Sequence, residues 1–561
     1  MQMKNLLNSL IIMAVSLALC SCAQNAKEKE LQTFIDNHVK KVKPLSKENN
    51  LAYWAAATSG KEEDYEKVKE LTFQIREIYS DPNDFAMLKE MMASGEIRNA
   101  VLKRQLELLY NGYLENQIEP DLLKQIVDLG NDIEMKFSTF RGSINGEKVT
   151  DNEIKEILKT EKDSAKREQT WLASKQVGAQ VADDLIRLVK LRNEGAQKLG
   201  FDNYHTLSLT AAEQDVNELD KLFDELYELT NEPYRKVKAE LDEKLAQDYG
   251  ISVDELMPWH YHDPFFQETP LVYDVDLDSY YKDKNVVELA EKFYAGIDLP
   301  IDDIVANSDL YDREGKNPHA FSTDIDREGD VRVLANVKDN ETWMETMLHE
   351  LGHAAYDKYH DPKLPYLLKQ PAHIFTTEGI AMFFGRLSRN PAWMQKMLDL
   401  TDQQRDEIQK VSDKYAQLKQ LIFARWAMVM YNFEKQLYAN PDQDLNKLWW
   451  QMVEKYQFIK APPGRDEPDW AAKIHFTIAP AYYHNYMLGE LFASQLHNYL
   501  VHKVLKLKSD ENVSYVGKKK VGDYLKKNIF APGAEYKWND MIKRATGEPL
   551  SPKYFVNQFV K

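Results

Sequence analysis

Residues 343–356 read WMETMLHELGHAAY, a run of good helix formers interrupted only by Gly352. Apolar side chains recur every three or four residues in this run, which predicts an amphipathic helix with one face in the core. His349 and His353 are four residues apart, so both imidazoles project from the same face of that helix. Two histidines in this arrangement can bind Zn²⁺, and Glu350 then lies beside the open position of the ion.

A catalytic zinc needs a third protein ligand and one position left for water. The metzincin arrangement would place glycine at 356 and histidine at 359, but the sequence has Tyr356 and Tyr359, which excludes that class. His360 is one residue out of phase with the pair and is expected at the surface. Glu378 fits better, because it is the sole carboxylate of the apolar segment that follows. A lone carboxylate in a buried helix should be paired in the core or bound to a metal.

The composition is that of a mainly helical protein. Gly (22) and Pro (21) are scarce among 561 residues, and amphipathic helical spacing runs from about Glu28 to Leu299. Between Ala320 and Val337 the residues alternate and are often β-branched, which predicts a β-hairpin next to the metal motif. We expect one helical unit of two lobes around a deep central cleft, with the hairpin on the cleft wall. The hairpin could pair with an extended peptide or be purely structural.

The charge balance excludes one class of partner. Acidic residues outnumber basic residues by 90 to 72, and the formal net charge is -18. Binding of a nucleic-acid backbone requires a basic surface, so nucleic acid is not expected as a partner. After the N-terminal segment, no uninterrupted apolar stretch approaches the roughly 18 residues of a membrane-spanning helix.

The N-terminus has the pattern of a targeting segment, with Lys4 followed by an apolar run over residues 10–19. The string LCSCA at residues 19–23 resembles a bacterial lipobox and predicts Cys22 as the lipidated residue. An ordinary signal peptide with two incidental cysteines is the alternative. Cys20 and Cys22 are the only cysteines, so cleavage before Cys22 would leave the mature chain with no other thiol, which excludes an internal disulfide, a cysteine nucleophile and a Cys-type zinc site.

This pattern predicts a signal peptide over residues 1–21 and a catalytic domain over residues 22–561. The protein is then expected to be an exported bacterial lipoprotein of the cell envelope, either periplasmic or associated with the outer membrane. Contact with the membrane is expected only through the lipid anchor.

The string His349-Glu350-Leu351-Gly352-His353, with Glu378 downstream, resembles the angiotensin-converting-enzyme family of peptidyl-dipeptidases, in a bacterial lipoprotein form. The resemblance extends from about residue 185 to the C-terminus and is faint before that. It implies a two-lobed helical fold, one Zn²⁺ per chain and oligopeptide substrates. Five further strings agree with the family: LRNE at 191–194, PWHYHDPFF at 258–266, KIH at 473–475, YHNY at 483–486 and TGEPL at 546–550.

The resemblance also implies roles for four residues near the C-terminus. Lys473 would hold the free C-terminal carboxylate of a substrate, and His475 would hold a substrate carbonyl. After a shift of one residue, Tyr483 would assist the carboxylate contact and Tyr486 would donate a hydrogen bond to the developing oxyanion. Without the resemblance, the lysine and histidine would read as a solvated basic pair, and the tyrosines as core or rim aromatics.

Three positions depart from the family pattern. Met382 stands where the family has an acid that orients the metal-binding histidines, so another group must do this. Asn485 replaces a chloride-binding arginine, which makes chloride dependence doubtful. The histidine-alanine pair of the active-site strand is replaced by Leu334-Ala335, so Ala335 would contact the substrate but the histidine contact would be missing.

Together these residues predict a zinc peptidase that releases C-terminal dipeptides from oligopeptides. Zinc would polarise the scissile carbonyl, Glu350 would accept a proton from the attacking water, and Tyr486 would stabilise the oxyanion. Two alternatives stay open. An endo-acting oligopeptidase of the thimet type would also cut amidated peptides, whereas a non-catalytic helical lipoprotein that binds peptides would leave Glu350 without a role.

Overall fold

The structure, a computed structural model, describes residues 2–272 and 276–560, with side chains from residue 26 onward. The signal-peptide prediction and the lipidation prediction at Cys22 concern side chains outside this described set. Within the described residues, no helix combines the length and the apolar character that crossing a membrane would require.

Helices dominate the described chain, as the sequence predicts. The first half contains α1 (Gln2–Ser59), α2 (Glu62–Tyr79), α3 (Pro82–Ser94), α4 (Ala100–Glu115), α5 (Pro120–Thr139), α6 (Asp151–Thr160), α7 (Ser164–Lys198), α8 (Tyr204–Ala211) and α9 (Val216–Tyr249). The second half contains α10 (Asp278–Tyr281), α11 (Val286–Gly296), α12 (Asp302–Asn307), α13 (Glu341–Lys358), α14 (Ile374–Gly385), α15 (Pro391–Leu398), α16 (Asp402–Ala439), α17 (Leu445–Gln457), α18 (His475–Ile478), α19 (His484–Tyr499), α20 (Lys519–Leu525), α21 (Trp538–Thr546) and α22 (Lys553–Phe559). The strands form two small antiparallel sheets, β1 (Gly142–Ile144) with β2 (Glu147–Val149) and β3 (Phe321–Asp324) with β4 (Val331–Leu334).

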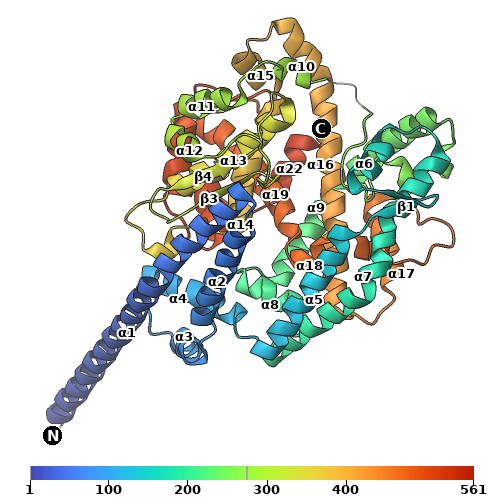
Figure 1. Ribbon diagram of the computed structural model, residues 1–561. Helices are drawn as coiled ribbons and strands as arrows, with labels where there is room; N and C mark the ends of the chain where they lie inside the picture. Colours follow the sequence, from blue (N-terminus) through green and yellow to red (C-terminus); the bar gives the residue numbers. More distant parts are fainter. Residues whose placement is uncertain (1, 273–275, 561) are drawn as a thin grey trace.

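The helices gather on both sides of α16, which runs through the middle of the molecule in Figure 1. In that view α7, α17 and β1 lie on one side, and α11 to α13 with β3 and β4 lie on the other. The C-terminal half of α16 is almost wholly buried, as expected for a helix covered on several faces. The mainly helical fold with a small sheet near the metal motif is therefore confirmed.

The predicted hairpin forms β3 and β4. Phe321 pairs with Leu334 and Asp324 pairs with Val331 in an antiparallel register. The turn between the strands contains Gly329 at φ 114°, a backbone conformation that glycine adopts without a steric cost. The hairpin packs against α13 and thus lies beside the metal motif, as the sequence predicts.

The hairpin of β1 and β2 was not predicted. Its turn is Asn145-Gly146, and both residues have positive φ, at 52° and 87°. An Asn-Gly pair between short β-type segments is a strong hairpin signal. The surrounding helical spacing masked that signal, because each strand is only three residues long.

Three helices meet at backbone contact around the metal motif. A Cβ atom added to Gly379 of α14 would lie 2.7 Å from a ring carbon of Phe492 and 2.9 Å from the carbonyl oxygen of Gly489, both on α19. A Cβ atom added to Gly352 of α13 would lie 3.0 Å from the Cα of Ala381 on α14. These small residues therefore set how closely α13, α14 and α19 approach one another.

Candidate metal centre and substrate-binding residues

The structure brings the three predicted metal ligands together. The Nε2 atoms of His349 and His353 on α13 are 3.3 Å apart. Oε2 of Glu378 on α14 lies 3.6 Å from the first of these nitrogens and 3.8 Å from the second. Two ligands at about 2.0–2.2 Å from one zinc ion, in tetrahedral geometry, are about 3.3–3.6 Å apart. The donor set therefore fits Zn²⁺ in both chemistry and spacing.

The protonation states of these ligands suit a metal. Burial lowers the pKa of His349 to about 4 and holds the pKa of His353 well below its usual value. Both imidazoles are then neutral at pH 7, which is the form that binds a metal ion. Burial raises the pKa of Glu378 to about 7, and a bound cation would favour its charged form. The three side chains keep 28%, 16% and 15% of their surface exposed, so solvent reaches the centre.

A threonine orients one of the histidines. Oγ1 of Thr377 lies 2.7 Å from Nδ1 of His353, a distance that fixes the ring and turns Nε2 towards the other ligands. Thr377 precedes Glu378 directly, so one turn of α14 supplies both a ligand and its support. The sequence predicted that some group must replace the acid missing at Met382, but not which group.

The other histidine, His349, lies near a network of charged side chains. The carboxylate of Glu345, one turn earlier on α13, raises the pKa of His349, although less than burial lowers it. Glu345 is itself held by Lys419, with 3.2 Å between Nζ and Oε1, and by Arg389 at 3.7 Å. This network anchors α13 to α16 just before the metal motif.

Replacing Thr377 with valine should weaken zinc binding about 10- to 100-fold, because valine keeps the shape but removes the hydroxyl that orients His353. The measurement is zinc retention in competition with a chelator of known affinity. Thr376→Val is the matched control, since the Thr376 hydroxyl bonds the carbonyl of His373 instead. An equal loss of affinity in both variants would contradict the assigned role.

Glu350 lies between the metal ligands and β3. Burial raises the pKa of its carboxyl to about 8, and the charge of Glu378 adds to this shift. The backbone N–H of Ser322 on β3 donates to the same carboxyl and opposes the shift. The carboxyl therefore lies beside the metal ligands, where a group that accepts a proton from an attacking water must lie.

The prediction that Ala335 contacts substrate is wrong. Ala335 is fully buried, directly after β4. Its N–H donates to the carbonyl of Asp309 at 2.9 Å, and its carbonyl accepts from Nζ of Lys316. Both main-chain groups are therefore used inside the protein, and neither is left for a peptide.

The strand that faces Glu350 is β3 and not β4. Ser322 of β3 supplies the N–H that reaches Glu350. The predicted contact was at Leu334-Ala335, at the end of β4.

The expectation for His360 is also wrong. This histidine is only 9% exposed, and neither ring nitrogen has a hydrogen-bond partner within the described residues. It does not join the ligand set of His349, His353 and Glu378, as expected, but it is not a surface residue.

Lys473 lies in a buried cluster and not in solvent. Its Nζ donates to Oε1 of Gln267 at 2.6 Å, and the side chain is almost completely covered. The ammonium also lies 5.1–5.5 Å from the centres of three aromatic rings, those of Phe265, Trp426 and Tyr483. Within the described residues, the one direct hydrogen-bond partner of this buried cation is a neutral amide, which favours the approach of an anion.

His475 and Tyr483 belong to the same cluster. Their rings are 5.1 Å apart, and the hydroxyl of Tyr483 accepts a hydrogen bond from Nε1 of Trp426 at 2.7 Å. Burial lowers the pKa of Lys473 to about 8, and burial with the nearby lysine lowers the pKa of His475 to about 4. Nδ1 of His475 is buried without a partner among the described residues, so it could bond a substrate.

Two of the strings that carry the resemblance position this cluster. The guanidinium of Arg192 on α7 donates to the carbonyls of Phe476 and Thr477, which follow the K-x-H string. The carboxylate of Asp263 accepts backbone N–H groups from the loop that carries Gln267. Gln267 itself was missed, because a single amide side chain has no spacing pattern that marks it.

Tyr486 and Tyr482 lie near the metal ligands. The charge of Glu378 raises the pKa of Tyr486, in addition to the larger effect of burial. Glu378 has the same effect on Tyr482, whose ring is 5.3 Å from that of Tyr486. Tyr486 therefore lies on the metal side of the segment and Tyr483 on the lysine side, and Tyr482 is a neighbour that the sequence analysis did not name.

Asn485 is paired with another amide. Its Oδ1 accepts from Nε2 of Gln214 at 2.8 Å in a buried position. Where the resemblance implies a chloride-binding arginine, this chain thus has the neutral Asn485, bonded to the neutral Gln214.

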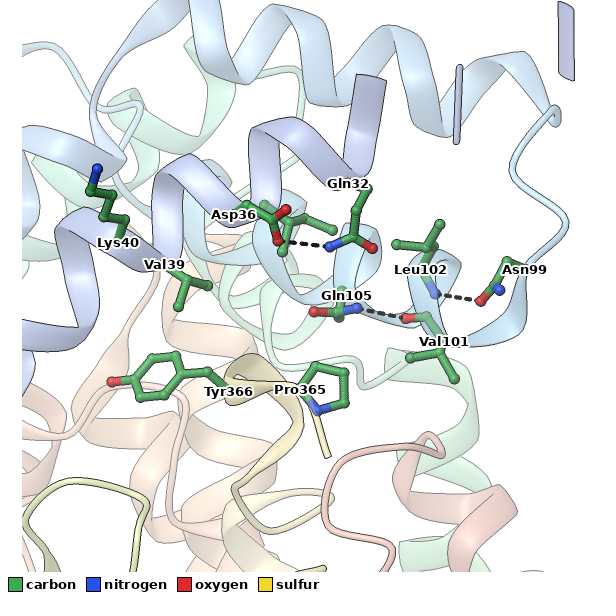
Figure 2. A pocket seen from close by; sticks show the side chains of 11 residues that line it. Gln32, Asp36, Val39, Lys40, Asn99, Val101, Leu102, Gln105, Pro365 and Tyr366 are labelled. Carbon is green, nitrogen blue, oxygen red and sulfur yellow. Dashed lines mark hydrogen bonds between the residues drawn. The ribbon is translucent and has the colours of Figure 1, made fainter. Parts of the chain in front are cut away.

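A separate hollow lies away from these residues. It has a volume of about 660 Å³ and lies between α1, α4 and the turn at Pro365-Tyr366 (Figure 2). Polar groups such as Gln32 and Asp36, which bond each other, form part of its wall. None of the predicted site residues lines it.

Comparison with known proteins gives one family. A family model described as angiotensin-converting enzyme matches residues 25–262 and 263–559. The chain is 26% identical to "Carboxypeptidase 1" of Bacillus subtilis over 274 residues, which are 44% of this chain and 54% of that protein. It is 21% identical to "Angiotensin-converting enzyme" of Theromyzon tessulatum, over 49% of this chain and 44% of the relative. It is 22% identical to "Inactive angiotensin-converting enzyme-related protein" of Caenorhabditis elegans, over 58% and 40%.

These matches span about half of the length of the relatives, or less. The family model nevertheless covers almost the whole chain, including the helices before residue 185, where the resemblance is faint by motif.

Proposed function

Because this chain belongs to the angiotensin-converting enzyme family of peptidases, we propose that it is a zinc-dependent peptidyl-dipeptidase that releases C-terminal dipeptides from oligopeptides. The observation that carries the proposal is the spacing of His349, His353 and Glu378 with Glu350 beside them. One relative is described as inactive, but all three ligands and Glu350 are present in this chain.

Zinc, when bound, supplies a Lewis acid that polarises the scissile carbonyl and makes the attacking water more acidic. Glu350 accepts the proton of that water as its oxygen bonds to the carbonyl carbon. The hydroxyl of Tyr486 donates a hydrogen bond to the oxygen that becomes negative. Glu350 then returns the proton to the leaving amine as the C–N bond breaks, so the carboxylate is restored at the end of the cycle.

The specificity for a chain end rests on the buried lysine. Lys473 with Gln267 and Tyr483 forms a group of one positive charge and two polar side chains. A free carboxylate would pair with that charge and satisfy it, whereas a neutral amide would leave it unpaired at a cost of about 2–5 kcal/mol. His475, in the same cluster, would hold a substrate carbonyl.

The targeting pattern supports a further part of the proposal. Residues 1–21 would be removed, and a lipid on Cys22 would hold the enzyme at a membrane of the cell envelope. The substrates would then be peptides outside the cytoplasm.

Peptides of matched sequence with a free acid or an amide at the C-terminus should differ at least about 30-fold in kcat/KM, because the amide leaves Lys473 unpaired. Mass spectrometry of the fragments should show dipeptides from the free acid. Lys473→Met should remove the difference between the two peptides, whereas the exposed control Lys460→Met should keep it.

Equal cleavage of both peptides at internal bonds would favour the endo-acting thimet-type alternative. No cleavage of either peptide by zinc-loaded protein would favour the non-catalytic peptide-binding alternative.

A further inference from the structure

His360 is a buried histidine with no partner. It lies two residues beyond the end of α13, and both ring nitrogens are closed to solvent and unbonded within the described part of the chain. Burial lowers the pKa of the ring to about 4. The backbone carbonyl of Asp357 raises the pKa by less, so the ring is neutral. Buried polar groups in proteins are almost always bonded. An unbonded neutral imidazole therefore points to a ligand that the protein itself does not supply.

Two carboxylates lie against this imidazole. One donor atom from each of Asp324, Asp357 and His360 forms a group in which all atoms are within 4.8 Å of one another. Among the described residues, the carboxylate of Asp357 makes no hydrogen bond and no ion pair. In Asp324, Oδ1 accepts the N–H groups of Asp326 and Arg327, at 3.2 and 2.8 Å, so Oδ2 is free.

The pKa values of both acids are raised. Burial holds the pKa of Asp357 well above its usual range, and the charge of Asp324 adds to this. Burial also raises the pKa of Asp324. Two carboxylates that share a site are unfavourable unless a cation or a proton lies between them.

The side chain of Arg327, the basic residue nearest to the two acids, bonds other groups. Arg327 donates to the carbonyl of Tyr366 at 3.3 Å and to Oε1 of Gln370 at 3.2 Å, and its guanidinium lies 4.9 Å from the Tyr366 ring centre. It acts on both acids through space and lowers the pKa of each, but it forms no ion pair with either in the described structure. Lys369 acts only through space on His360. The negative charge of the acid pair is therefore only partly balanced.

We propose that Asp324, Asp357 and His360 bind a second divalent metal ion, separate from the ion that His349, His353 and Glu378 would hold. The three donor atoms lie within 4.8 Å of one another, and the ligands of one tetrahedral ion are about 3.3–3.6 Å apart, so the carboxylates would rotate towards the ion to close the site. One imidazole with carboxylate oxygens suits Zn²⁺ or Mn²⁺ better than Mg²⁺ or Ca²⁺, which prefer oxygen ligands alone. The carbonyl end of α13 adds partial negative charge at the same place.

The position of this second site gives it a structural role. His353 and Asp357 are four residues apart on α13, about 6 Å along the helix axis and on the same face. On β3, Ser322 bonds Glu350, and Asp324 lies two residues further along the same side of the strand. An ion bound to Asp324 and α13 would therefore hold β3 in register beside Glu350, without touching the reacting peptide.

The test is the metal content of the full-length protein after saturation with Zn²⁺ and removal of free ion. The wild type should hold two ions per chain, and Asp357→Asn and His360→Gln should each hold one. Asp326→Asn is the matched control, because this acid is on the same hairpin but pairs with Lys47 outside the cluster, and it should keep two ions.

A second measurement counts ions at the proposed site alone, with the catalytic centre disabled. His353→Ala, which keeps the second site intact, should bind one Mn²⁺ per chain by electron paramagnetic resonance. Adding His360→Gln to it should bring the number to zero. One ion per chain in the wild type with either metal, or the same number in His360→Gln as in the wild type, would overturn the proposal.

Discussion

Glu350→Gln should lower kcat by about 10²- to 10⁴-fold while zinc stays bound, because glutamine keeps the shape of the side chain but cannot accept a proton. Glu350 is not one of the three ligands, so the metal content should equal that of the wild type. The measurements are kcat on a free-acid peptide and zinc per chain on the same sample.

Glu350→Asp is the informative companion of this variant. It keeps the carboxylate but withdraws it by about one C–C bond, so its activity should lie between those of the wild type and Glu350→Gln. If Glu350→Gln retained its zinc and lost less than tenfold in kcat, another group would have to accept the proton and the mechanism would fail.

The second large effect concerns the metal itself. His353→Ala removes one of the three ligands at a site where the donor atoms are only 3.3–3.8 Å apart. We expect zinc affinity of the catalytic centre to fall by more than about 100-fold, since loss of a supporting contact alone costs 10- to 100-fold. Activity should fall with it, as read from zinc per chain and from kcat/KM at a fixed low zinc concentration.

The control for this substitution is His502→Ala, a histidine that bonds the carbonyl of Leu507 far along the chain from both metal groups. It should retain wild-type zinc and activity. A His353→Ala protein that still cleaved peptides at the wild-type rate under chelation would show that the centre of His349, His353 and Glu378 is not the catalytic one.

The candidate metal centre was predictable because residues close together in the sequence supply two of its ligands. Two histidines four residues apart on a helix share a face whatever the rest of the fold does. Glu378 was recognisable because an isolated carboxylate in an apolar helix has few explanations. The supporting Thr377 was not recognisable, since a hydroxyl in a helix is usually bonded to a nearby carbonyl.

The errors have equally physical reasons. The two strands of a hairpin have the same alternating pattern, so the sequence does not say which strand faces the neighbouring helix. The substrate contact was predicted at Ala335, next to β4, whereas Ser322 of β3 reaches Glu350. His360 was judged by helical phase, but α13 ends at Lys358, and beyond that residue the phase no longer applies.

Contacts between residues far apart in the sequence could not be predicted from it. Gln267 bonds Lys473, which is 206 positions away in the sequence, and its amide carries no motif of its own. The helices before residue 185 are amphipathic without chemical signatures, so their membership of the family became visible only by comparison along the whole chain.

The backbone contacts at Gly352, Gly379 and Gly489 limit how this protein can change. A single methyl group at Gly379 would act as a wedge between α14 and α19 and would move the glutamate ligand on the adjacent residue. The distances between the candidate metal ligands are thus fixed by main-chain contacts and leave little freedom for gradual adjustment. New substrate preferences, in evolution or in the laboratory, should therefore arise in the loops and in the segment around Lys473, while the three-helix frame stays as it is.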